Sequence, residues 1–269
     1  MNSLTAVLLG FVQGITEFLP ISSSGHLALL EHYLHTPGGG LSFDILLHLG
    51  TLAALLTYFA SDWLAMGRSL LQPSPYNRFD RRLIICLMVA CIPGALAGVL
   101  LEHQAETLFR EPLRIAFLMG SVGILLIVAE KKARHERPLT NLNLGDALLI
   151  GLSQALAIMP GVSRSGITMT CALFLGFTRE TSARFSFLLA TPIIAGAGIF
   201  HLRKWFTTPP ENLSWLAGTL GFLAALVSSY LTIKYLLRFL KRHTFIPFAV
   251  YRLVLATLIL GLSLFFSVK

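Results

Sequence analysis

The chain has 269 residues, of which 55% are hydrophobic and only 13% are charged, and its mean hydropathy is +0.73. A soluble domain carries about 25% charged residues, so this composition cannot supply the surface of a soluble enzyme. The net charge of +8 comes from short basic clusters between apolar stretches, a pattern typical of membrane-protein loops and not of nucleic-acid binding. We therefore predict an all-α polytopic membrane protein that forms a single membrane domain over 1–269.

Two apolar runs are each interrupted by a short polar turn that contains Pro, Gly and Ser. The turns are 20–25 and 160–166, and each is followed by an apolar arm that is too short to cross a bilayer. The apolar arms cover 3–19 and 26–34 in the first case, and 144–159 and 167–177 in the second. Irregular backbone at membrane depth is tolerated only where protein buries it or water lines it. We therefore predict two re-entrant helical hairpins whose tips face a polar cavity.

Six further apolar stretches are uninterrupted and long enough to span a membrane. They lie at 41–60, 83–101, 113–130, 184–200, 213–235 and 245–266. Basic residues concentrate in the connecting segments 61–82, 131–137 and 236–243, whereas 102–112 contains more acidic than basic residues. The positive-inside rule makes the first three segments cytoplasmic. We expect 102–112, the connection 201–212 and both termini on the external side.

A displacement of 141 positions aligns the two halves of the chain at their polar turns. The identities pair Gly10, Gln13, Ser22, Ser24 and Gly25 with Gly151, Gln154, Ser163, Ser165 and Gly166. Each half then contains one hairpin and three spans, with repeat one over about 1–137 and repeat two over about 141–269. Because three is odd, the two halves insert upside down relative to each other. Inverted repeats with broken helices place a binding site near the midplane, where the tips meet.

The two tips carry polar residues that are unusual at membrane depth. The first contributes Gln13, Thr16, Glu17, Ser22, Ser23, Ser24 and His26, and the second contributes Gln154, Ser163, Arg164, Ser165 and Thr168. A charged side chain at this depth costs a few kcal/mol or more and marks function by default, which singles out Glu17 and Arg164. A structural ion pair that only holds the hairpins together is the alternative, but it does not account for the serines and the histidine.

The chemistry of these tips favours a phosphorylated ligand. Each tip opens a short helix with a Ser-Gly pair, Ser24-Gly25 or Ser165-Gly166, and the N–H groups at a helix N-terminus bind phosphate. Arg164 would add a bidentate clamp. The combination indicates a pyrophosphate whose charge is neutralised by a divalent cation on Glu17. His26 or one of the serines would supply the nucleophile or the general base.

The motifs at the tips resemble those of the undecaprenyl-pyrophosphate phosphatases, the bacitracin-resistance type of membrane phosphatase. The resemblance rests on Gln13-Gly14-x-Thr16-Glu17-Phe18-Leu19-Pro20-x-Ser22-Ser23-Ser24-Gly25-His26 and Pro160-Gly161-x-Ser163-Arg164-Ser165-Gly166-x-Thr168. It extends to Phe185-Ser186-Phe187-Leu188-Leu189-Ala190 and Phe245-Ile246-Pro247-Phe248-Ala249-x-Tyr251-Arg252, and so covers nearly the whole chain.

This resemblance implies removal of the terminal phosphate from a C55 lipid pyrophosphate, which recycles the carrier lipid for cell-wall synthesis. It implies a bacterial inner-membrane location with a site open to the periplasmic side, a dependence on Mg2+ or Ca2+, and membrane lipids as surroundings, with a homodimer left open. The essential positions carry over as Glu17, Ser23, His26 and Arg164. Phosphate-binding positions carry over as Ser22, Ser24, Gly25, Ser163, Ser165, Gly166 and Thr168. Some members have a second glutamate where this chain has Gln13, so we expect Gln13 to offer its side-chain oxygen to the metal beside Glu17.

The division of labour at the first tip is a separate hypothesis. His26 lies three residues after Ser23, a spacing that lets the two side chains approach each other at the start of a helix. We predict Ser23 as the nucleophile and His26 as its base. The alternatives are a phosphohistidine at His26 and direct attack by water. A lipid-phosphate transporter with the same inverted-repeat site is the alternative function.

Three residues outside the tips are secondary candidates. Asp44 and His48 lie four positions apart and could form a proton relay or a second metal contact; otherwise His48 bonds to a neighbouring helix. Arg252 precedes a wholly apolar run, so we expect it to snorkel to the membrane interface, with phosphate binding as the alternative.

Overall fold

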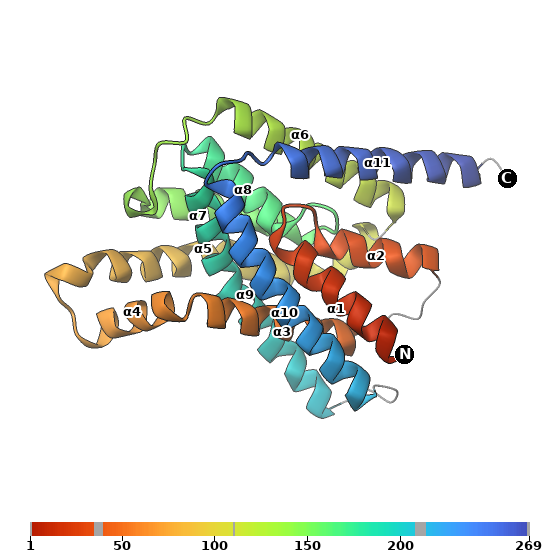
Figure 1. Ribbon diagram of the computed structural model, residues 1–269, viewed down its shortest axis with the longest axis horizontal. Coiled ribbons are helices and arrows are strands. Elements are labelled where there is room, and N and C mark those ends of the chain that lie inside the picture. The colour runs from red at the N-terminus through yellow and green to blue at the C-terminus, as the bar shows by residue number, and fades with distance from the viewer. Residues whose placement is uncertain (1, 35–39, 110, 208–213, 268–269) are drawn as a thin grey trace.

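The computed structural model describes residues 2–34, 40–109, 111–207 and 214–267. This part of the chain forms eleven α-helices and three short 3-10 helices and contains no strand. The α-helices are α1 (Ser3–Phe18), α2 (Ser23–Leu34), α3 (Gly40–Tyr58), α4 (Ala60–Leu71), α5 (Arg78–Phe109), α6 (Pro112–Lys132), α7 (Leu144–Ala155), α8 (Arg164–Phe174), α9 (Arg179–Thr207), α10 (Trp215–Leu240) and α11 (Ile246–Ser267). The 3-10 helices are η1 (Pro75–Asn77), η2 (Leu139–Asn141) and η3 (Leu156–Ile158) (Figure 1).

The predicted spans are confirmed as helices. Within the described residues, five helices are long and apolar enough to cross a membrane, and the count is six if α3 and α4, which meet at a bend of 70°, are taken as one broken span. The chain is therefore a multi-pass helical membrane protein. Its outward faces are apolar, as Phe117, Met88 and Leu258 illustrate with exposures of 69%, 66% and 57%. In a bilayer these side chains face lipid.

Three predicted loops proved to be largely helical. Segment 61–82 forms most of α4, all of η1 and the start of α5, because α4 continues from α3 after the bend at Phe59. Segment 102–112 is helical as far as Phe109, where α5 ends. The connection 201–212 begins inside α9, which continues to Thr207, and 208–213 lies outside the described residues. Hydropathy marks where a helix leaves the apolar region and not where its hydrogen bonding stops.

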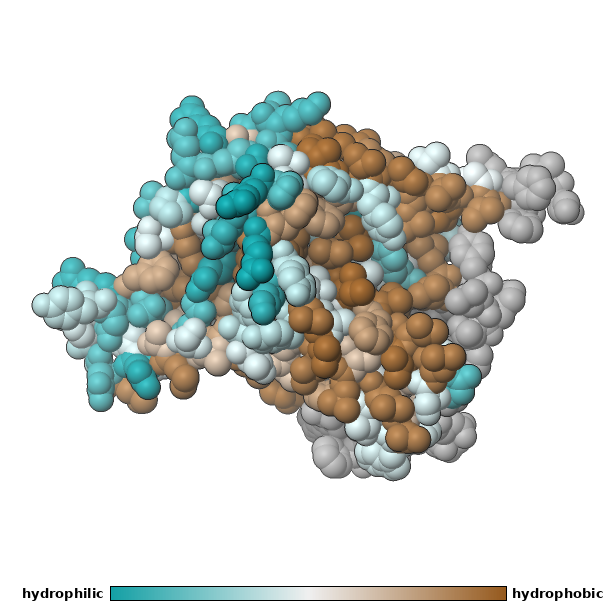
Figure 2. All heavy atoms as spheres, viewed as in Figure 1, coloured by the Kyte–Doolittle hydropathy of each residue, from teal (hydrophilic) through white to brown (hydrophobic). Residues whose placement is uncertain are grey.

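Three polar connections between helices lie at one end of the bundle. They are the α4–α5, α6–α7 and α10–α11 connections, toward the left of Figure 1, and Figure 2 shows hydrophilic residues on the same side. Glu130 at the end of α6 connects two of these regions, since it accepts from Arg179 Nε at 2.6 Å and from the Phe245 N–H at 3.3 Å. The three basic segments of the sequence therefore share one end of the molecule.

The helix pair α7–α8 starts and ends at this same place. Arg137, which precedes α7, donates to Asp146 Oδ2 in the first turn of α7 at 2.6 Å and to the Leu175 carbonyl just after α8 at 2.8 Å. Its backbone N–H also bonds to the Gly176 carbonyl. With 12 residues in α7 and 11 in α8, neither helix alone reaches the roughly 30 Å of a bilayer core.

Close helix packing holds the other short helix, α1, against α10. A Cβ added to Gly14 would lie 2.6 Å from the Ala225 carbonyl oxygen and would also clash with the Ser228 hydroxyl, so only glycine fits here. Gly151 of α7 is equally restricted, because a Cβ there would lie 2.7 Å from Ala90 Cα of α5. Small residues that allow such close approach are typical of helix interfaces in membranes. The contacts at Gly14 and Gly151 therefore fix the positions of α1 and α7, and with them the positions of the two polar turns that follow these helices.

Candidate active site

The two turns have the same local backbone geometry. Ser22 and Ser163 both have a left-handed φ, 77° and 74°, which non-glycine residues rarely adopt. Each serine caps the helix that follows: Ser22 Oγ accepts the Gly25 N–H at 3.3 Å, and Ser163 Oγ accepts the Gly166 N–H at 3.0 Å. Such backbone strain costs about 1–3 kcal/mol and concentrates at functional sites. The equivalence agrees with the 141-residue displacement that pairs these serines in the sequence.

The turns also touch each other. Ser165 Oγ donates to the Leu19 carbonyl of the first turn at 3.0 Å. A Cβ added to Gly25 would lie 3.5 Å from Gly161 Cα, so the two backbones approach closely. The tips predicted from the sequence therefore do meet, near the middle of the molecule in Figure 1. The N-termini of α2 and α8 are brought together with them.

Arg252 clamps both turns, and the expectations for this residue were wrong. Its side chain is fully buried, so it neither snorkels to the interface nor reaches a ligand. The guanidinium instead donates to four backbone carbonyls: Pro20 at 3.0 Å, Gly161 at 2.8 Å, Val162 at 3.1 Å and Met119 of α6 at 3.0 Å. Within the described residues no carboxylate lies within 4 Å of it. Arg252 thus satisfies the irregular backbone and leaves an uncompensated positive charge behind the tips.

Glu17 is the centre of the polar cluster in front of the tips. Its side chain is buried, and Oε2 accepts from Ser23 Oγ at 2.6 Å and from Gln13 Nε2 at 3.1 Å. Arg164 Nη1 lies 3.7 Å from Oε1, and His48 Nε2 lies 3.8 Å from Oε2. These partners give a buried carboxylate the hydrogen bonds and positive charges that it needs there. The pairing of Glu17 with Arg164 that the sequence suggested is present, although it is only one of four contacts.

His26 is held by partners other than Ser23. Nδ1 lies 2.6 Å from the Ser22 carbonyl and therefore carries the proton, which leaves Nε2 as the acceptor for the Tyr251 hydroxyl at 2.7 Å. The two rings are parallel, with centroids 5.7 Å apart. The expected approach of Ser23 to His26 is absent, because the Ser23 hydroxyl points to Glu17 instead. Helical spacing permitted the contact, but the left-handed turn at Ser22 orients the two side chains differently.

The remaining serines line both turns in matching pairs. Ser22 Oγ lies 3.4 Å from the exposed Ser24 Oγ, and Ser163 Oγ lies 3.2 Å from Ser165 Oγ. Thr168 lies one turn further along α8, where its hydroxyl is 2.7 Å from Ser186 Oγ of α9 and donates to the Arg164 carbonyl. Thr168 is therefore placed to support the start of α8, while the serine pairs lie at the tips themselves.

A divalent cation fits the residues beside Glu17. Gln13 Oε1 is buried and has no hydrogen-bond partner, so an oxygen ligand is available next to the carboxylate. The described residues contain no group of three or more His, Cys, Asp or Glu that could enclose a metal on their own. Mg2+ commonly binds through one or two carboxylates and completes its shell with water and substrate phosphate oxygens. The observed donor set suits that mode of binding.

Sequence reasoning missed Tyr251 and undervalued His48. Tyr251 stood inside one of the family-like motifs, but nothing local indicated that it would reach a histidine 225 positions away. His48 was considered together with Asp44; its Nδ1 bonds to the Asp44 carbonyl, which directs Nε2 toward Glu17. A histidine on an otherwise apolar helix was the available signal.

These features define a class: a multi-pass helical membrane protein with a buried, phosphate-suited cluster of Glu, Arg, Ser and His where two helix N-termini meet. The model of the family described as bacitracin resistance protein BacA matches residues 6–258. The chain belongs to this family. It is 49% identical to an undecaprenyl-diphosphatase of Moorella thermoacetica over 97% of this chain and 98% of the relative. It is 44% identical to an undecaprenyl-diphosphatase of Pelotomaculum thermopropionicum, over 98% of this chain and 97% of that relative.

Proposed function

We propose that the protein hydrolyses undecaprenyl pyrophosphate to undecaprenyl phosphate and inorganic phosphate, and so recycles the lipid carrier of cell-wall synthesis. The relatives that carry the name undecaprenyl-diphosphatase match nearly the whole chain, which supports this substrate. The observation that carries the proposal is the short Ser23–Glu17 hydrogen bond beside Arg164, at the junction of two helix N-termini. In this proposal the Ser23 hydroxyl is the nucleophile, Glu17 accepts its proton and Arg164 binds the anion.

Pyrophosphate binding is assigned to both tips. The N-termini of α2 and α8 offer backbone N–H groups and positive helix ends. Arg164 supplies a planar fork for two phosphate oxygens, and the exposed Ser24 hydroxyl adds a donor. The buried charge of Arg252 makes the potential at the tips more positive without touching the ligand. Glu17 with Gln13 would hold Mg2+ or Ca2+, whose charge neutralises the pyrophosphate.

Hydrolysis follows in two steps in this proposal. The Ser23 oxygen attacks the terminal phosphorus, the bond from phosphorus to the bridging oxygen breaks, and undecaprenyl phosphate leaves. The Ser23 proton passes to Glu17, which already accepts its hydrogen bond; this replaces His26 as the base for that proton. Water then hydrolyses the phosphoserine and releases phosphate. His26, which Ser22 holds through Nδ1, is assigned to the activation of this water: the water takes the place of the Tyr251 hydroxyl at Nε2 and gives its proton to that nitrogen. Glu17 returns its proton to the Ser23 oxygen as phosphate leaves.

Rapid quench with labelled substrate tests the order of events. We expect an acid-stable phosphoserine that is lost in Ser23→Ala. An acid-labile, base-stable adduct that persists in Ser23→Ala would show a phosphohistidine at His26 instead. If no adduct forms and oxygen from heavy-oxygen water enters phosphate in one step, water attacks directly.

The membrane arrangement is part of the same proposal. We infer that α1–α2 and α7–α8 are re-entrant hairpins of two inverted repeats, about 1–137 and 141–269, that enter from opposite sides. Three observations support this. Helix α8 is short, α7 begins and α8 ends beside Arg137, and Ser22 and Ser163 share the same left-handed backbone geometry. The basic joints then lie in the cytoplasm of a bacterial inner membrane, and the site opens to the periplasmic side. Assembly as a homodimer stays a prediction.

A lipid-phosphate transporter is the second candidate, because the equivalent tips are a feature of alternating-access folds. Phosphate release from undecaprenyl pyrophosphate by the purified protein in detergent separates the two functions, since no second compartment exists there. We expect release that depends on a divalent cation. A protein that binds the lipid and releases no phosphate would be a transporter.

A further inference from the structure

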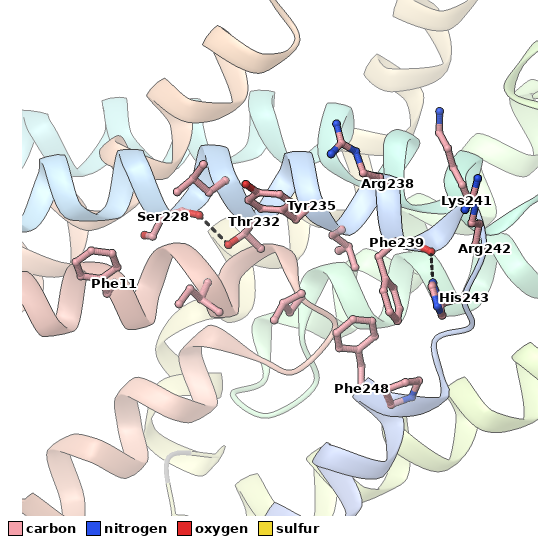
Figure 3. A pocket seen from close by; sticks show the side chains of 15 residues that line it. Phe11, Ser228, Thr232, Tyr235, Arg238, Phe239, Lys241, Arg242, His243 and Phe248 are labelled. Atoms are coloured by element: carbon pink, nitrogen blue, oxygen red, sulfur yellow. Dashed lines mark hydrogen bonds between the residues drawn. The ribbon is translucent and has the colours of Figure 1, made fainter.

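A large groove lies beside the first tip, between α1, α10 and α11. It has a volume of about 1090 Å³, and its walls are mostly apolar, with Phe11 and Ile15 from α1, Leu231 from α10 and Phe248 from α11 (Figure 3). The groove exists because consecutive helices diverge: α10 packs against α1 and α3, whereas α11 packs against α6. Its walls are suited to hydrocarbon chains.

One end of the groove is basic. Arg238, Lys241, Arg242 and His243 gather there, beyond the row of aromatic rings in Figure 3. Lys241 Nζ lies 3.5 Å from Glu180, and His243 bonds to the Phe239 carbonyl and stacks on its ring. Arg238 and Arg242 are exposed, and in the described parts of the chain no carboxylate lies within 4 Å of either. Two arginines are therefore left without an acidic partner at the mouth of an apolar groove.

The length of the groove matches one leaflet of a bilayer. Its lining residues on α10 run from Ser228 to the joint residue Lys241, which is 13 positions and about 20 Å along a helix. Half of a bilayer, with its headgroup region, measures about 20–22 Å. The apolar end, at Phe11 and Ser228, then lies near the midplane, and the basic end lies at the headgroup level.

We propose that this groove binds one anionic glycerophospholipid of the leaflet at the basic end, with its phosphate on Arg238 and Arg242 and its acyl chains along α10. Basic pockets between membrane helices at the headgroup level recognise such lipids. The substrate does not account for the same features, because a pyrophosphate bound at Glu17 and Arg164 leaves the basic end without an anion. This binding is independent of hydrolysis.

Lipid titration of the delipidated full-length protein, read by native mass spectrometry, tests the proposal. We expect phosphatidylglycerol to bind at least tenfold more tightly than phosphatidylcholine. The variant Arg238→Gln/Arg242→Gln should weaken phosphatidylglycerol roughly tenfold to thirtyfold and leave phosphatidylcholine unchanged. Leu231→Trp, which fills the groove, should weaken both lipids.

The matched control is Lys131→Gln/Lys132→Gln, which removes two exposed charges at the end of α6, outside the groove. It should bind phosphatidylglycerol like the native protein. Equal affinity for the two lipids, or an equal loss in the control variant, would overturn the proposed site. Displacement of phosphatidylglycerol by a polyprenyl monophosphate of much higher affinity would assign the groove to the reaction product instead.

Discussion

The hydroxyl of Ser23 lies 2.6 Å from Glu17 Oε2, although the two residues are six positions apart in the chain and a left-handed turn lies between them. The contact joins the end of α1 to the first residue of α2 across the break. Since Glu17 also lies near Arg164 and His48, one carboxylate connects both halves of the site. The first prediction concerns this residue.

Glu17→Gln should lower kcat by a factor on the order of 10²–10³, because the amide can neither accept the Ser23 proton nor neutralise a metal. Phosphate release at saturating Mg2+ measures this, and thermal unfolding in detergent checks that the variant folds. Asp62→Asn, whose carboxylate pairs with Arg184 away from the tips, is the control. Near-native turnover of Glu17→Gln would remove Glu17 from the mechanism.

Arg164→Lys should reduce kcat/KM roughly tenfold to hundredfold. Lysine keeps the charge but loses the planar fork that binds two phosphate oxygens, and a hydrogen bond to a charged group contributes about 1.5–3 kcal/mol. Steady-state kinetics with undecaprenyl pyrophosphate measure the loss. Arg114→Lys, an exposed residue at the start of α6, should leave the kinetics unchanged. If Lys restores the native rate, Arg164 serves only as a charge partner for Glu17.

Tyr251→Phe should lower kcat roughly twofold to tenfold while KM stays close to its native value. The change deletes the 2.7 Å hydrogen bond that fixes the His26 ring, and a typical hydrogen bond contributes about 0.5–1.5 kcal/mol. The split between kcat and KM distinguishes positioning of His26 from a role in binding. Tyr76→Phe, at a fully solvent-exposed position, is the matched control. A pure rise in KM would contradict the positioning role.

Arg252→Met should lower the free energy of unfolding by roughly 3–5 kcal/mol, because four carbonyls of the tips and α6 lose their buried donor. Thermal unfolding in detergent should show the loss, and activity should fall with it. Arg252→Lys keeps the charge but cannot reach all four oxygens, so an intermediate loss is expected. Arg134→Gln, at an exposed site after α6 and outside the groove, serves as the control. Native stability in Arg252→Met would show that other groups hold the tips.

The proposed orientation predicts which sites react with an impermeant thiol reagent. In a background without native cysteines, Glu111→Cys between α5 and α6 should react in intact cells from the periplasmic side. Arg134→Cys after α6 should react only after lysis. Both positions are exposed, so accessibility of the side chain is not limiting. The reverse labelling pattern would show that the protein has the opposite orientation in the membrane, with the site open to the cytoplasmic side.

The sequence by itself determined the membrane class, the apolar helices and the positions of the two polar turns. Hydropathy and helix breakers act locally, so a run of apolar residues or a Pro-Gly-Ser turn has the same meaning wherever it packs. The repeat and the unusual charges then singled out Glu17, Arg164 and the serines as the candidate site. The helical continuation of α4 and α5 past the apolar stretches escaped this reasoning, because it depends on hydrogen bonding and not on hydropathy.

Only the tertiary structure decided which groups meet. Arg252 reaches Pro20 and Gly161, positions 232 and 91 residues away, and Tyr251 reaches His26 over a comparable separation. No spacing rule connects such residues, since their contact depends on how α11 packs against α6 and the tips. The same holds for Ser23, whose partner was decided by the left-handed φ of Ser22 and not by helical periodicity. The sequence thus indicated which residues form the candidate site, and packing determined which hydrogen bonds they make. The physical reason is that a buried polar atom must bond to a partner that the packing brings near it.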